Sequence, residues 1–304
     1  KDFSCVEGFC PSFVTVHGGG LRKPEAMAGG IEGDQLPEPQ HPTLDRPWNV
    51  LIPGVGGSGV TTLGALLGMA AHLEGKGCTV LDQAGLAQKF GPVVTHIRIA
   101  AKQDDIYAVR IAAGETDLLL GCDLVVAAGE DSLTRLNDQI SHAVINSHES
   151  ATAEFTRNPD AQVPGKAMRE ALMDAVGAEK THFIDATYLA TRLLGDSIAT
   201  NLFLLGFAYQ QGLLPLSAEA IEKAISINGV AAELNQQAFR WGRRAALERE
   251  AVEKLARPVE MAEPICQTLE EIVDWRVDFL TRYQNAAYTK RYRAQVEQVR
   301  ALDT

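Results

Sequence analysis

A glycine-rich stretch, "GVGGSGVTT" at residues 54–62, is the first place where this sequence could do chemistry. It follows the apolar run "WNVLIP" and precedes an apolar stretch of helical length. Gly54, Gly56 and Gly59 have the G-x-G-x-x-G spacing that turns a strand into a helix close to a phosphate. The unpaired N–H groups and positive dipole end of that helix favour an anion. The stretch predicts a phosphate cradle, or else a tight turn that needs glycine only for packing.

Three chemistries known for such loops can be compared with its residues. A Walker loop needs lysine where Val60 stands, so the cation that grips the phosphates is missing. A nucleophile elbow around Ser58 needs glycine at that same position, and no convincing acid–histidine pair follows. A nicotinamide dinucleotide site stays open, because Asp82 ends the next expected strand, where an acid binds the ribose hydroxyls. An aspartate at a strand end is also a common turn former.

The polar loop after Asp82, "QAGLAQKFGP", carries Lys89. Loops at this end of a parallel sheet line the ligand crevice, so Lys89 is a candidate to meet a negative group. A solvated lysine without a ligand is as good an interpretation. Later strand ends offer further residues for the same crevice: Gly129, Glu130, Asn146 and Ser147.

Two cysteines near the start of the sequence, Cys5 and Cys10, are candidate iron–sulfur ligands, because Pro11 directly follows the second and a Cys-Pro pair is typical of such sites. Two thiolates cannot complete a four-iron cluster, so either the other ligands lie upstream or these are plain thiols. The total of five cysteines is odd, and three stand in apolar segments, which argues against a disulfide framework. The seven histidines lack metal-binding spacing, so we interpret them as structural or solvated.

The bulk composition narrows the classes of function. The chain has 304 residues, of which 46% are hydrophobic and 22% charged, as in ordinary globular proteins. A formal net charge of −11 argues against nucleic acid or an anionic membrane as the main partner. No apolar run reaches the length of a membrane span and no leader opens the chain, so we expect a cytoplasmic location.

Strand-like and helix-like segments alternate after residue 48, which favours an α/β fold with a doubly wound, mostly parallel, Rossmann-like sheet. We expect strands at 49–53, 78–82, 93–100, 123–129, 143–147 and 182–186, and helices at 60–74, from 131, and at 166–176. An all-helical extension follows, with helices expected in 196–212, 215–230, 231–256 and 266–300. Ser217 and Gly229 are the expected cap and stop of the second of these.

An aromatic stripe runs along the last expected helix. Trp275, Phe279 and Tyr283 recur at four-residue spacing, and Tyr288 and Tyr292 follow near the same face. Such a stripe is usually a packing seam. The alternative is a surface that docks against the remainder of a longer chain.

Composition divides the chain into five parts, and its first residue, a lysine, suggests a piece of a longer polypeptide. Residues 1–16 look like the tail of an upstream cysteine-rich segment. Residues 17–47, with six glycines and five prolines, have the composition of a linker. We expect the Rossmann-like domain at 48–196, its helical part at 197–258, and the start of a C-terminal helical domain at 259–304.

Several separated motifs together resemble a known family. These are "KDFSCVEGFCPSFVTV", the glycine loop, "LDQAGLAQKFGPVVTHIRIA", "GCDLVVAAGED", "GDSIATNLFLLGFAYQQGLLPLS" and "NGVAAELNQQAFRWGRRAA". They resemble the γ-domain region of fused 2-oxoacid:ferredoxin oxidoreductases, in particular the indolepyruvate ferredoxin oxidoreductase type. The likeness runs through almost the whole chain.

The resemblance implies oxidative decarboxylation of a 2-oxoacid on thiamine diphosphate, with the acyl group passing to coenzyme A and electrons passing through [4Fe-4S] clusters to ferredoxin. Thiamine diphosphate and Mg²⁺ would lie on other domains, so the piece alone should be inactive. It would serve assembly with other domains or subunits, in a homo-oligomer, and the placing of coenzyme A. The implied coenzyme A contacts are Gly54, Gly56, Gly57, Ser58, Gly59 and Thr61, with Lys89 weaker, and the implied cluster ligands are Cys5 and Cys10. The alternative stays an NAD(P)-dependent dehydrogenase using Asp82.

Overall fold

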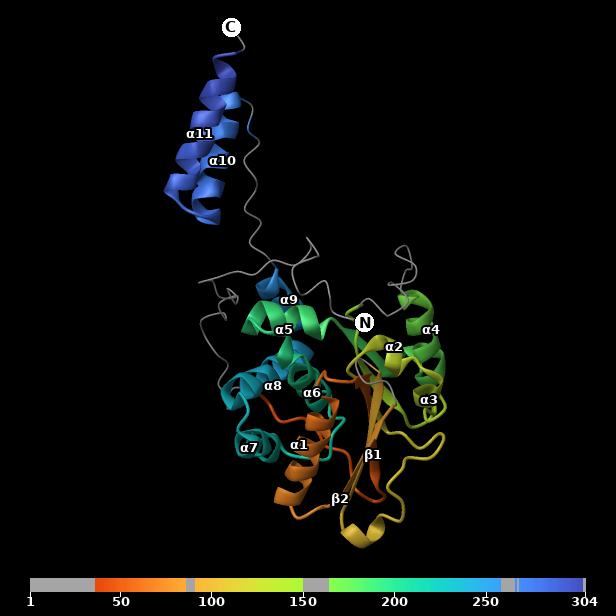
Figure 1. The fold of residues 1–304 in the computed structure, drawn as a ribbon. Coiled ribbons are helices and arrows are strands. Elements are labelled where there is room, and N and C mark those ends of the chain that lie inside the picture. Colours follow the sequence, from red (N-terminus) through yellow and green to blue (C-terminus); the bar gives the residue numbers. More distant parts are fainter. Residues whose placement is uncertain (1–35, 86–90, 150–163, 258–265, 267, 303–304) are drawn as a thin grey trace, which may run out of the picture. The chain divides into compact units, whose positions relative to one another are not determined.

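The computed structural model describes residues 36–85, 91–149, 164–257, 266 and 268–302 (Figure 1). They fall into two compact units that separate between Arg257 and Pro258. The first unit is built on a sheet of six strands: β1 (Trp48–Val55), β2 (Gly77–Ala84), β3 (Pro92–Ala100), β4 (Leu118–Gly121), β5 (His142–Asn146) and β6 (Thr181–Ile184). Its helices are α1 (Val60–Leu73), α2 (Leu124–Ala127), α3 (Glu130–Leu133), α4 (Gly165–Val176), α5 (Ala186–Leu194), α6 (Thr200–Gln210), α7 (Ala218–Asn228), α8 (Ala232–Leu247) and α9 (Arg249–Ala256).

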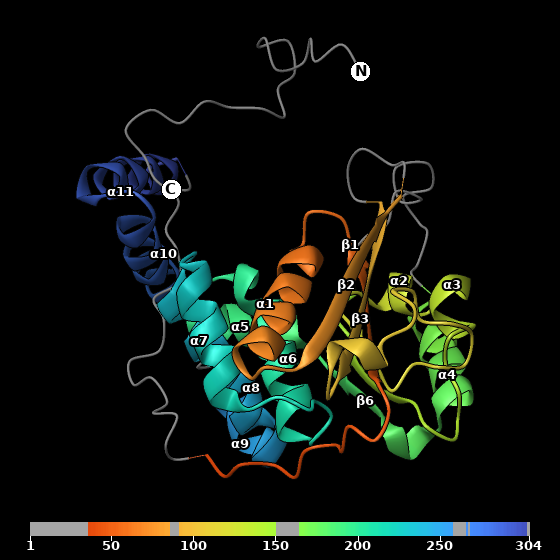
Figure 2. The same cartoon turned by 90° about the horizontal axis from the view of Figure 1, so that it is seen from below.

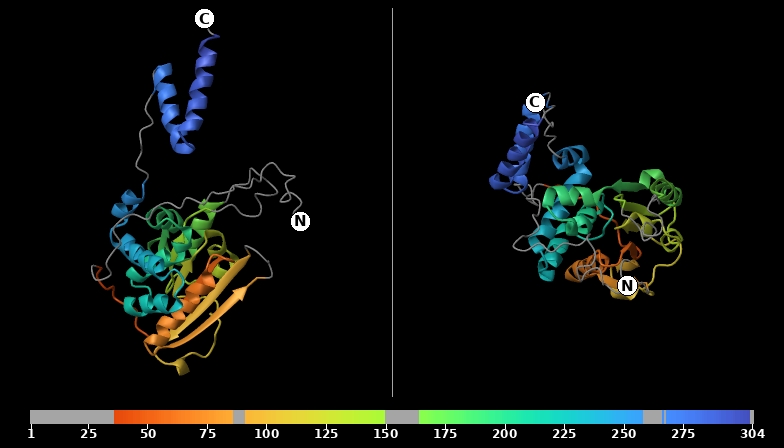
Figure 3. Two further views of the ribbon diagram at one scale, coloured as in Figure 1. Left: turned by 60° about the vertical axis from the view of Figure 1, so that its left-hand side comes forward. Right: turned by 45° about the horizontal axis from the view of Figure 1, so that its top comes forward.

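The strand order is β2-β3-β1-β4-β5-β6. β1, β4, β5 and β6 pair in parallel, whereas β3 is antiparallel to both β1 and β2. The expected mostly parallel sheet is confirmed, with β3 as its reversed strand. Only residues 85–91 connect β2 to β3, which is too short for the crossover that parallel neighbours need, so the two strands run in opposite directions. Figure 3 (left) shows this orange-to-gold pair at one edge of the sheet.

One predicted strand, residues 123–129, is wrong. The strand is β4, at 118–121, and residues 124–127 form the helix α2. Asp123 marks the boundary, because its side chain accepts a hydrogen bond from the Val126 N–H and so caps the helix. The apolar run that begins at Leu118 is long enough for a strand and a helical turn together, so its apolar character alone did not show where the strand ends.

Two of the expected C-terminal helices are each split in two. The helix expected at 231–256 breaks at Glu248 into α8 and α9. The helix expected at 266–300 breaks after Tyr283, and the Asn285 side chain caps the helix that follows by accepting from the Tyr288 N–H. The predicted cap and stop of α7 are confirmed, since the Ser217 hydroxyl accepts from the Ala220 N–H and Gly229 ends the helix at φ 71°.

Helices cover both faces of the sheet. α1 and α5 to α9 pack on one face, and α2 to α4 pack on the other (Figure 2). Side chains alternate between the two cores along each strand: Val50 and Ile52 belong to the first core, and Leu51 belongs to the second. All eleven residues of α6 are buried, which makes this helix the centre of the first core.

Part of the predicted linker, 17–47, is fastened to the fold. Its residues 36–47, named here the strap, run across the ends of α6 and α8, and the preceding residues lie outside the described part of the chain. Arg46 donates two hydrogen bonds to the fully buried carboxylate of Asp117, with the Nη1–Oδ2 distance at 2.9 Å. An isolated buried carboxylate is costly, so this bidentate pair makes the strap a part of the folded unit.

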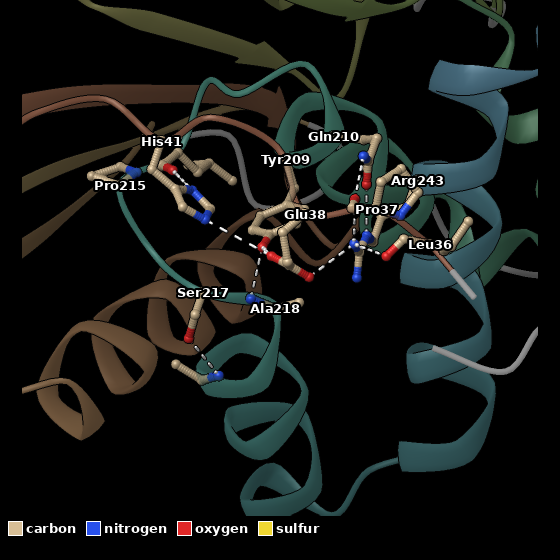
Figure 4. Close-up of polar contacts among 12 residues, drawn as sticks. Leu36, Pro37, Glu38, His41, Tyr209, Gln210, Pro215, Ser217, Ala218 and Arg243 are labelled. Carbon is tan, nitrogen blue, oxygen red and sulfur yellow. Dashed lines mark hydrogen bonds and ion pairs between the residues drawn. The ribbon is translucent and has the colours of Figure 1, made fainter. Parts of the chain in front are cut away.

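Arg243 of α8 is the main anchor of the strap (Figure 4). Its guanidinium is only 1% exposed and donates to Gln210 Oε1 (2.8 Å), the Pro37 carbonyl (3.1 Å) and Glu38 Oε1 (3.0 Å). The ring of Tyr209 lies 5.0 Å from the guanidinium carbon. Burial and the neighbouring Glu38 carboxylate raise the pKa of the Tyr209 phenol, which stays protonated and donates to Glu38.

The second unit is a hairpin of α10 (Leu269–Tyr283) and α11 (Ala286–Arg300). The rings of Trp275, Phe279, Tyr283 and Tyr288 follow one another at centroid distances of 6.1, 6.4 and 6.3 Å. Tyr283 is nevertheless 72% exposed. The aromatic stripe therefore packs against itself, and its role as a docking surface stays a prediction. Within the described residues, no helix has the length and apolar character to cross a membrane.

Candidate functional site

The glycine loop lies between β1 and α1, as the sequence predicts. Gly57 (φ 89°) and Gly59 (φ 93°) adopt left-handed backbone conformations that side chains disfavour. Gly59 is the N-cap of α1 and, having no side chain, leaves the first N–H groups of the helix without a side-chain acceptor. A Cβ on Gly57 would meet no atom of the described residues within 4 Å, so these residues leave the space directly above the loop open.

Within the described part of the chain, four hydrogen bonds hold residues 56–58 of the loop in place. The Gly56 N–H donates to the Gly91 carbonyl (2.7 Å), and the Ser58 N–H and hydroxyl both donate to the Val55 carbonyl (3.1 and 2.6 Å). The Asn201 side-chain amide, from α6, donates to the Ser58 carbonyl (2.8 Å). Among the described residues, the N–H groups of Gly57 and Gly59 have no acceptor. The loop thus offers donors in a conformation that is already fixed.

The glycines of the loop differ in how much space surrounds the position of a Cβ atom. A Cβ on Gly54 would lie 2.5 Å from Val60 Cγ2 and 3.0 Å from Cys122 Cβ, so this glycine lets α1 and β4 approach β1. A Cβ on Gly56 would lie 3.2 Å from the Gly91 carbonyl oxygen. Packing therefore explains Gly54, whereas it does not explain the open space beside Gly57. The packing interpretation is thus confirmed at Gly54, and the phosphate cradle stays a prediction.

A groove of about 1560 Å³ opens beside the loop at the carboxyl ends of the parallel strands. It brings together six residues that the sequence predicts for a ligand crevice: Gly56, Gly57, Ser58, Gly129, Glu130 and Asn146. Four other predicted residues are not part of this lining: Gly54, Gly59, Thr61 and Ser147. Lys89, Cys5 and Cys10 fall outside the described residues, so their assignments stay predictions.

Asp82 lies away from the groove. Its carboxylate accepts a hydrogen bond of 2.5 Å from the Thr95 hydroxyl across the β2–β3 pair, and the groove is lined by the neighbouring Gln83 instead. The antiparallel strand β3 separates β2 from β1, so Asp82 does not stand on the strand beside the glycine loop. Its assignment to a ribose stays a prediction, and would require the carboxylate to exchange Thr95 for the sugar.

The charges around the groove are mixed. Its acidic lining consists of Asp123, Glu130, Asp131 and Asp196, and its basic lining of Arg110 and His148. Asp131 is paired with Arg135 (2.7 Å) and lies 3.7 Å from Arg110. The described side chains that line the groove therefore carry more negative than positive charge, and the positive potential for an anion comes from the backbone at the start of α1.

A polar network on the floor of the groove was missed by sequence reasoning. The buried Asn146 amide donates to the Cys122 carbonyl (3.2 Å) and to the Thr187 hydroxyl (2.9 Å). Close by, His148 Nδ1 lies 3.2 Å from Asp185. Only Asn146 was predicted, from its place at a strand end. The other partners stand on helices or loops, with no motif to mark them.

His96 is a buried neutral group just behind the groove. It accepts from the Ile111 N–H at Nδ1 (3.3 Å), so its Nε2 carries the proton and donates to Gln83 Oε1 (2.8 Å). Burial, with Arg135 and Arg110 nearby, lowers its pKa to about 4. This contact orients Gln83 at the groove wall. His96 fits the prediction of structural histidines.

Cys78 in β2 is a half-buried thiol, and Cys122, directly after β4, is a buried one. Burial raises the pKa of the Cys122 thiol to about 12 and that of Cys78 to about 11. They pack as small hydrophobic residues, as the sequence predicts. Within the described part of the chain, no group of three or more metal-ligating side chains is arranged to hold a metal ion.

The chain matches the family described as pyruvate ferredoxin/flavodoxin oxidoreductase over residues 49–245. It is 31% identical over 215 residues to the indolepyruvate oxidoreductase subunit IorB of Pyrococcus horikoshii, covering 67% of this chain and 98% of that one. It is 28% identical over 207 residues to the same subunit of Thermococcus kodakarensis, with the same coverage. In fold, it is similar to the 2-oxoglutarate:ferredoxin oxidoreductase of Magnetococcus marinus, with a TM-score of 0.50, 15% identity, and coverage of 67% of this chain and 31% of that one.

Proposed function

This chain belongs to the pyruvate ferredoxin/flavodoxin oxidoreductase family, and we propose that it is the γ-type component of an enzyme that oxidises an aryl 2-oxoacid such as indolepyruvate. The observation that carries the proposal is the family match together with an indolepyruvate oxidoreductase subunit that aligns over 98% of its length. In the proposed reaction the 2-oxoacid and coenzyme A give the acyl-coenzyme A, carbon dioxide, a proton and two electrons, which ferredoxin accepts.

Other parts of the enzyme carry the chemistry in this proposal. Thiamine diphosphate with Mg²⁺ supplies the carbanion chemistry of decarboxylation, and [4Fe-4S] clusters carry the electrons. Cys5 and Cys10 are the candidate cluster ligands within this chain. The chain itself serves assembly with the other domains or subunits, in a cytoplasmic homo-oligomer.

We further propose that the groove takes part in binding coenzyme A. Four features fit this ligand: the fixed loop, the acceptor-free N–H groups of Gly57 and Gly59, the uncapped start of α1, and the size of the groove. Pro92, Val94 and Val126 give one wall an apolar surface for the adenine or the pantetheine arm. The carboxylates on the rim oppose a polyanion, so the backbone donors must outweigh them.

The reaction is tested anaerobically on the complete enzyme that contains this chain. We expect reduction of a viologen dye that requires indolepyruvate, thiamine diphosphate and coenzyme A, with pyruvate a weaker substrate. Omission of coenzyme A is the internal control for the acyl acceptor. No thiamine-dependent dye reduction with any 2-oxoacid would overturn the proposal.

Coenzyme A binding is tested separately by thermal unfolding of the same protein. A ligand at about 100 times its dissociation constant adds about 2.7 kcal/mol to the folded state and raises Tm. We expect this shift with coenzyme A and not with NADH. A shift with NADH alone favours the dehydrogenase alternative, and no shift with either leaves the loop as a packing element.

A further inference from the structure

We propose that Asn201 is the positioning residue of the glycine loop, holding the Ser58–Gly59 peptide in the orientation in which the loop presents its donors to an anion. The inference rests on the proposed function only in naming coenzyme A as the source of that anion. The glycine motif does not point to this side chain. It stands 143 positions after Ser58 in the sequence, on a different helix.

The contact between Asn201 and the loop is close and shielded. The Asn201 amide nitrogen lies 2.8 Å from the Ser58 carbonyl oxygen, and the residue is only 5% exposed. The same nitrogen would lie 3.5 Å from a Cβ on Gly59, which is ordinary van der Waals contact. Asn201 also lines the groove. It therefore meets the loop at the point where Ser58 passes into the N-cap of α1.

The loop needs such a contact because of its own composition. Ser58 stands between Gly57 and Gly59, and glycine allows nearly every backbone conformation, so steric hindrance alone does not fix the intervening peptides. In a trans peptide the carbonyl and the following N–H point in opposite directions. A hydrogen bond that holds the Ser58 carbonyl therefore also aims the Gly59 N–H, one of the two loop donors without an acceptor among the described residues.

The helix that carries Asn201 is a rigid support. Every residue of α6 is buried, and the adjacent Thr200 hydroxyl donates to the Ser197 carbonyl (2.6 Å) at the helix start. In the other hydrogen bonds of the loop, the acceptors are the carbonyl of Val55, within the loop itself, and the carbonyl of Gly91, in the β2–β3 connection. Among the described contacts, Asn201 is thus the one that ties the loop to the helical layer.

Two substitutions separate the hydrogen bond from the volume of the side chain. Asn201→Asp keeps the shape but sets a carboxylate against the Ser58 carbonyl, and Asn201→Leu removes the donor at similar size. Asn235→Leu is the matched control, because its amide also donates to a backbone carbonyl, that of Val230 (2.9 Å), at an exposed site on α8. The variants are made in the complete enzyme.

The rate of amide hydrogen exchange over residues 55–62 measures how well ordered the loop is when no ligand is bound. We expect exchange to rise about tenfold in both Asn201 variants, the effect of losing one hydrogen bond, and not in Asn235→Leu. In steady-state kinetics we expect the KM for coenzyme A to rise about tenfold, while kcat and the KM for the 2-oxoacid stay within twofold. A general loss of structure would instead lower kcat.

The outcomes distinguish this inference from the proposal on which it rests. Unchanged loop exchange in both Asn201 variants overturns the inference, as does a fall in kcat with no change in the KM for coenzyme A. If exchange rises but the unmodified enzyme shows no dependence on coenzyme A, the proposed ligand is wrong and the positioning of the loop by Asn201 is supported.

Discussion

Gly206 of α6 and Gly242 of α8 each lie directly against the backbone of the other helix. A Cβ on Gly206 would overlap the Phe239 carbonyl oxygen, and a Cβ on Gly242 would overlap that of Phe203. The two glycines are reciprocal: each removes the side chain that would push the helices apart. Because α6 carries Asn201 and α8 carries Arg243, this close crossing also fixes the supports of the glycine loop and of the strap.

Gly206→Ala should destabilise the folded chain by about 2–3 kcal/mol, because backbone atoms cannot move aside as a side chain can. Chemical denaturation measures this directly. Gly68→Ala in α1 is the control, since its Cβ would meet only a Val80 methyl group, at 3.0 Å. Alanine is a better helix former than glycine by up to about 1 kcal/mol, so the control should be near neutral. Equal losses in both variants would refute the close-packing explanation.

Arg243→Met should cost about 1–3 kcal/mol of folding free energy, because it leaves the amide oxygen of Gln210 and the carbonyl of Pro37 without their donor, whereas the Glu38 side chain is 57% exposed and can be solvated. Arg244→Met, one residue on, is the matched control: its pair with Glu248 is exposed and worth about 0.5 kcal/mol at most. Urea titrations of both variants compare these values. If Arg243→Met is no worse than the control, the strap is not a structural part of the domain.

The lowered pKa of His96 predicts that the stability of the folded chain depends on pH. Its folded pKa, about 4, lies below the ordinary value of 6.5, so the unfolded chain binds a proton that the folded chain does not. Stability should therefore fall as pH drops from about 6.5 to about 4, and the stabilisation is fully present above 6.5. Replacing His96 by Gln should reduce this slope, and His142 and His182, whose pKa values burial also lowers, should account for part of the remainder. An unchanged slope in the His96→Gln variant would show that His96 does not contribute to it.

The sequence patterns that were reliable are local ones. The glycine turn, the Ser217 cap of α7 and the Gly229 stop each depend on a few adjacent residues, and each lies where it was predicted. The direction of β3 could not be predicted, because the chain reverses in a connection without a short turn motif. The break at Glu248 has no glycine or proline to mark it.

The candidate site was predictable only in part, for the same physical reason. Residues at the ends of parallel strands share one edge of the sheet, so Asn146, at the end of β5, could be placed beside the loop. Gly129 and Glu130 also line the groove, but they do so from the start of α3 and not from the strand end that the sequence predicts. Asn201 could not, because its contact with Ser58 depends on how α6 packs and leaves no periodic pattern. Contacts of this kind are fixed by tertiary packing alone.

The buried thiols predict selective chemical labelling. Cys122 is 7% exposed and its pKa is raised to about 12, so it holds almost no reactive thiolate at pH 8. We expect iodoacetamide to leave Cys122 and Cys78 unmodified in the native protein and to modify both in urea, as read by peptide mass spectrometry. The partly exposed Cys266 serves as the reference for native labelling. Rapid native modification of Cys122 would mean that the groove floor opens.

Gly57 and Gly54 allow ligand binding and packing to be tested apart. Gly57→Ala places an alanine at a φ of 89°, which an L side chain disfavours, and puts a methyl group in the open space above the loop. We expect coenzyme A affinity, measured by calorimetry on the complete enzyme, to fall at least about tenfold. Gly75→Ala is the matched control, because it has a similar φ of 68° and equally open surroundings but lies at the other end of α1.

Gly54→Ala should behave in the opposite way, since its Cβ would strike Val60 and Cys122 and so lower stability through the core. We expect its Tm to fall further than that of Gly57→Ala, while coenzyme A affinity follows the fraction of folded protein. The decisive comparison is between Gly57→Ala and Gly75→Ala. Both introduce the same kind of backbone strain, so equal affinity for coenzyme A in these two variants would mean that the phosphates do not rest on the loop.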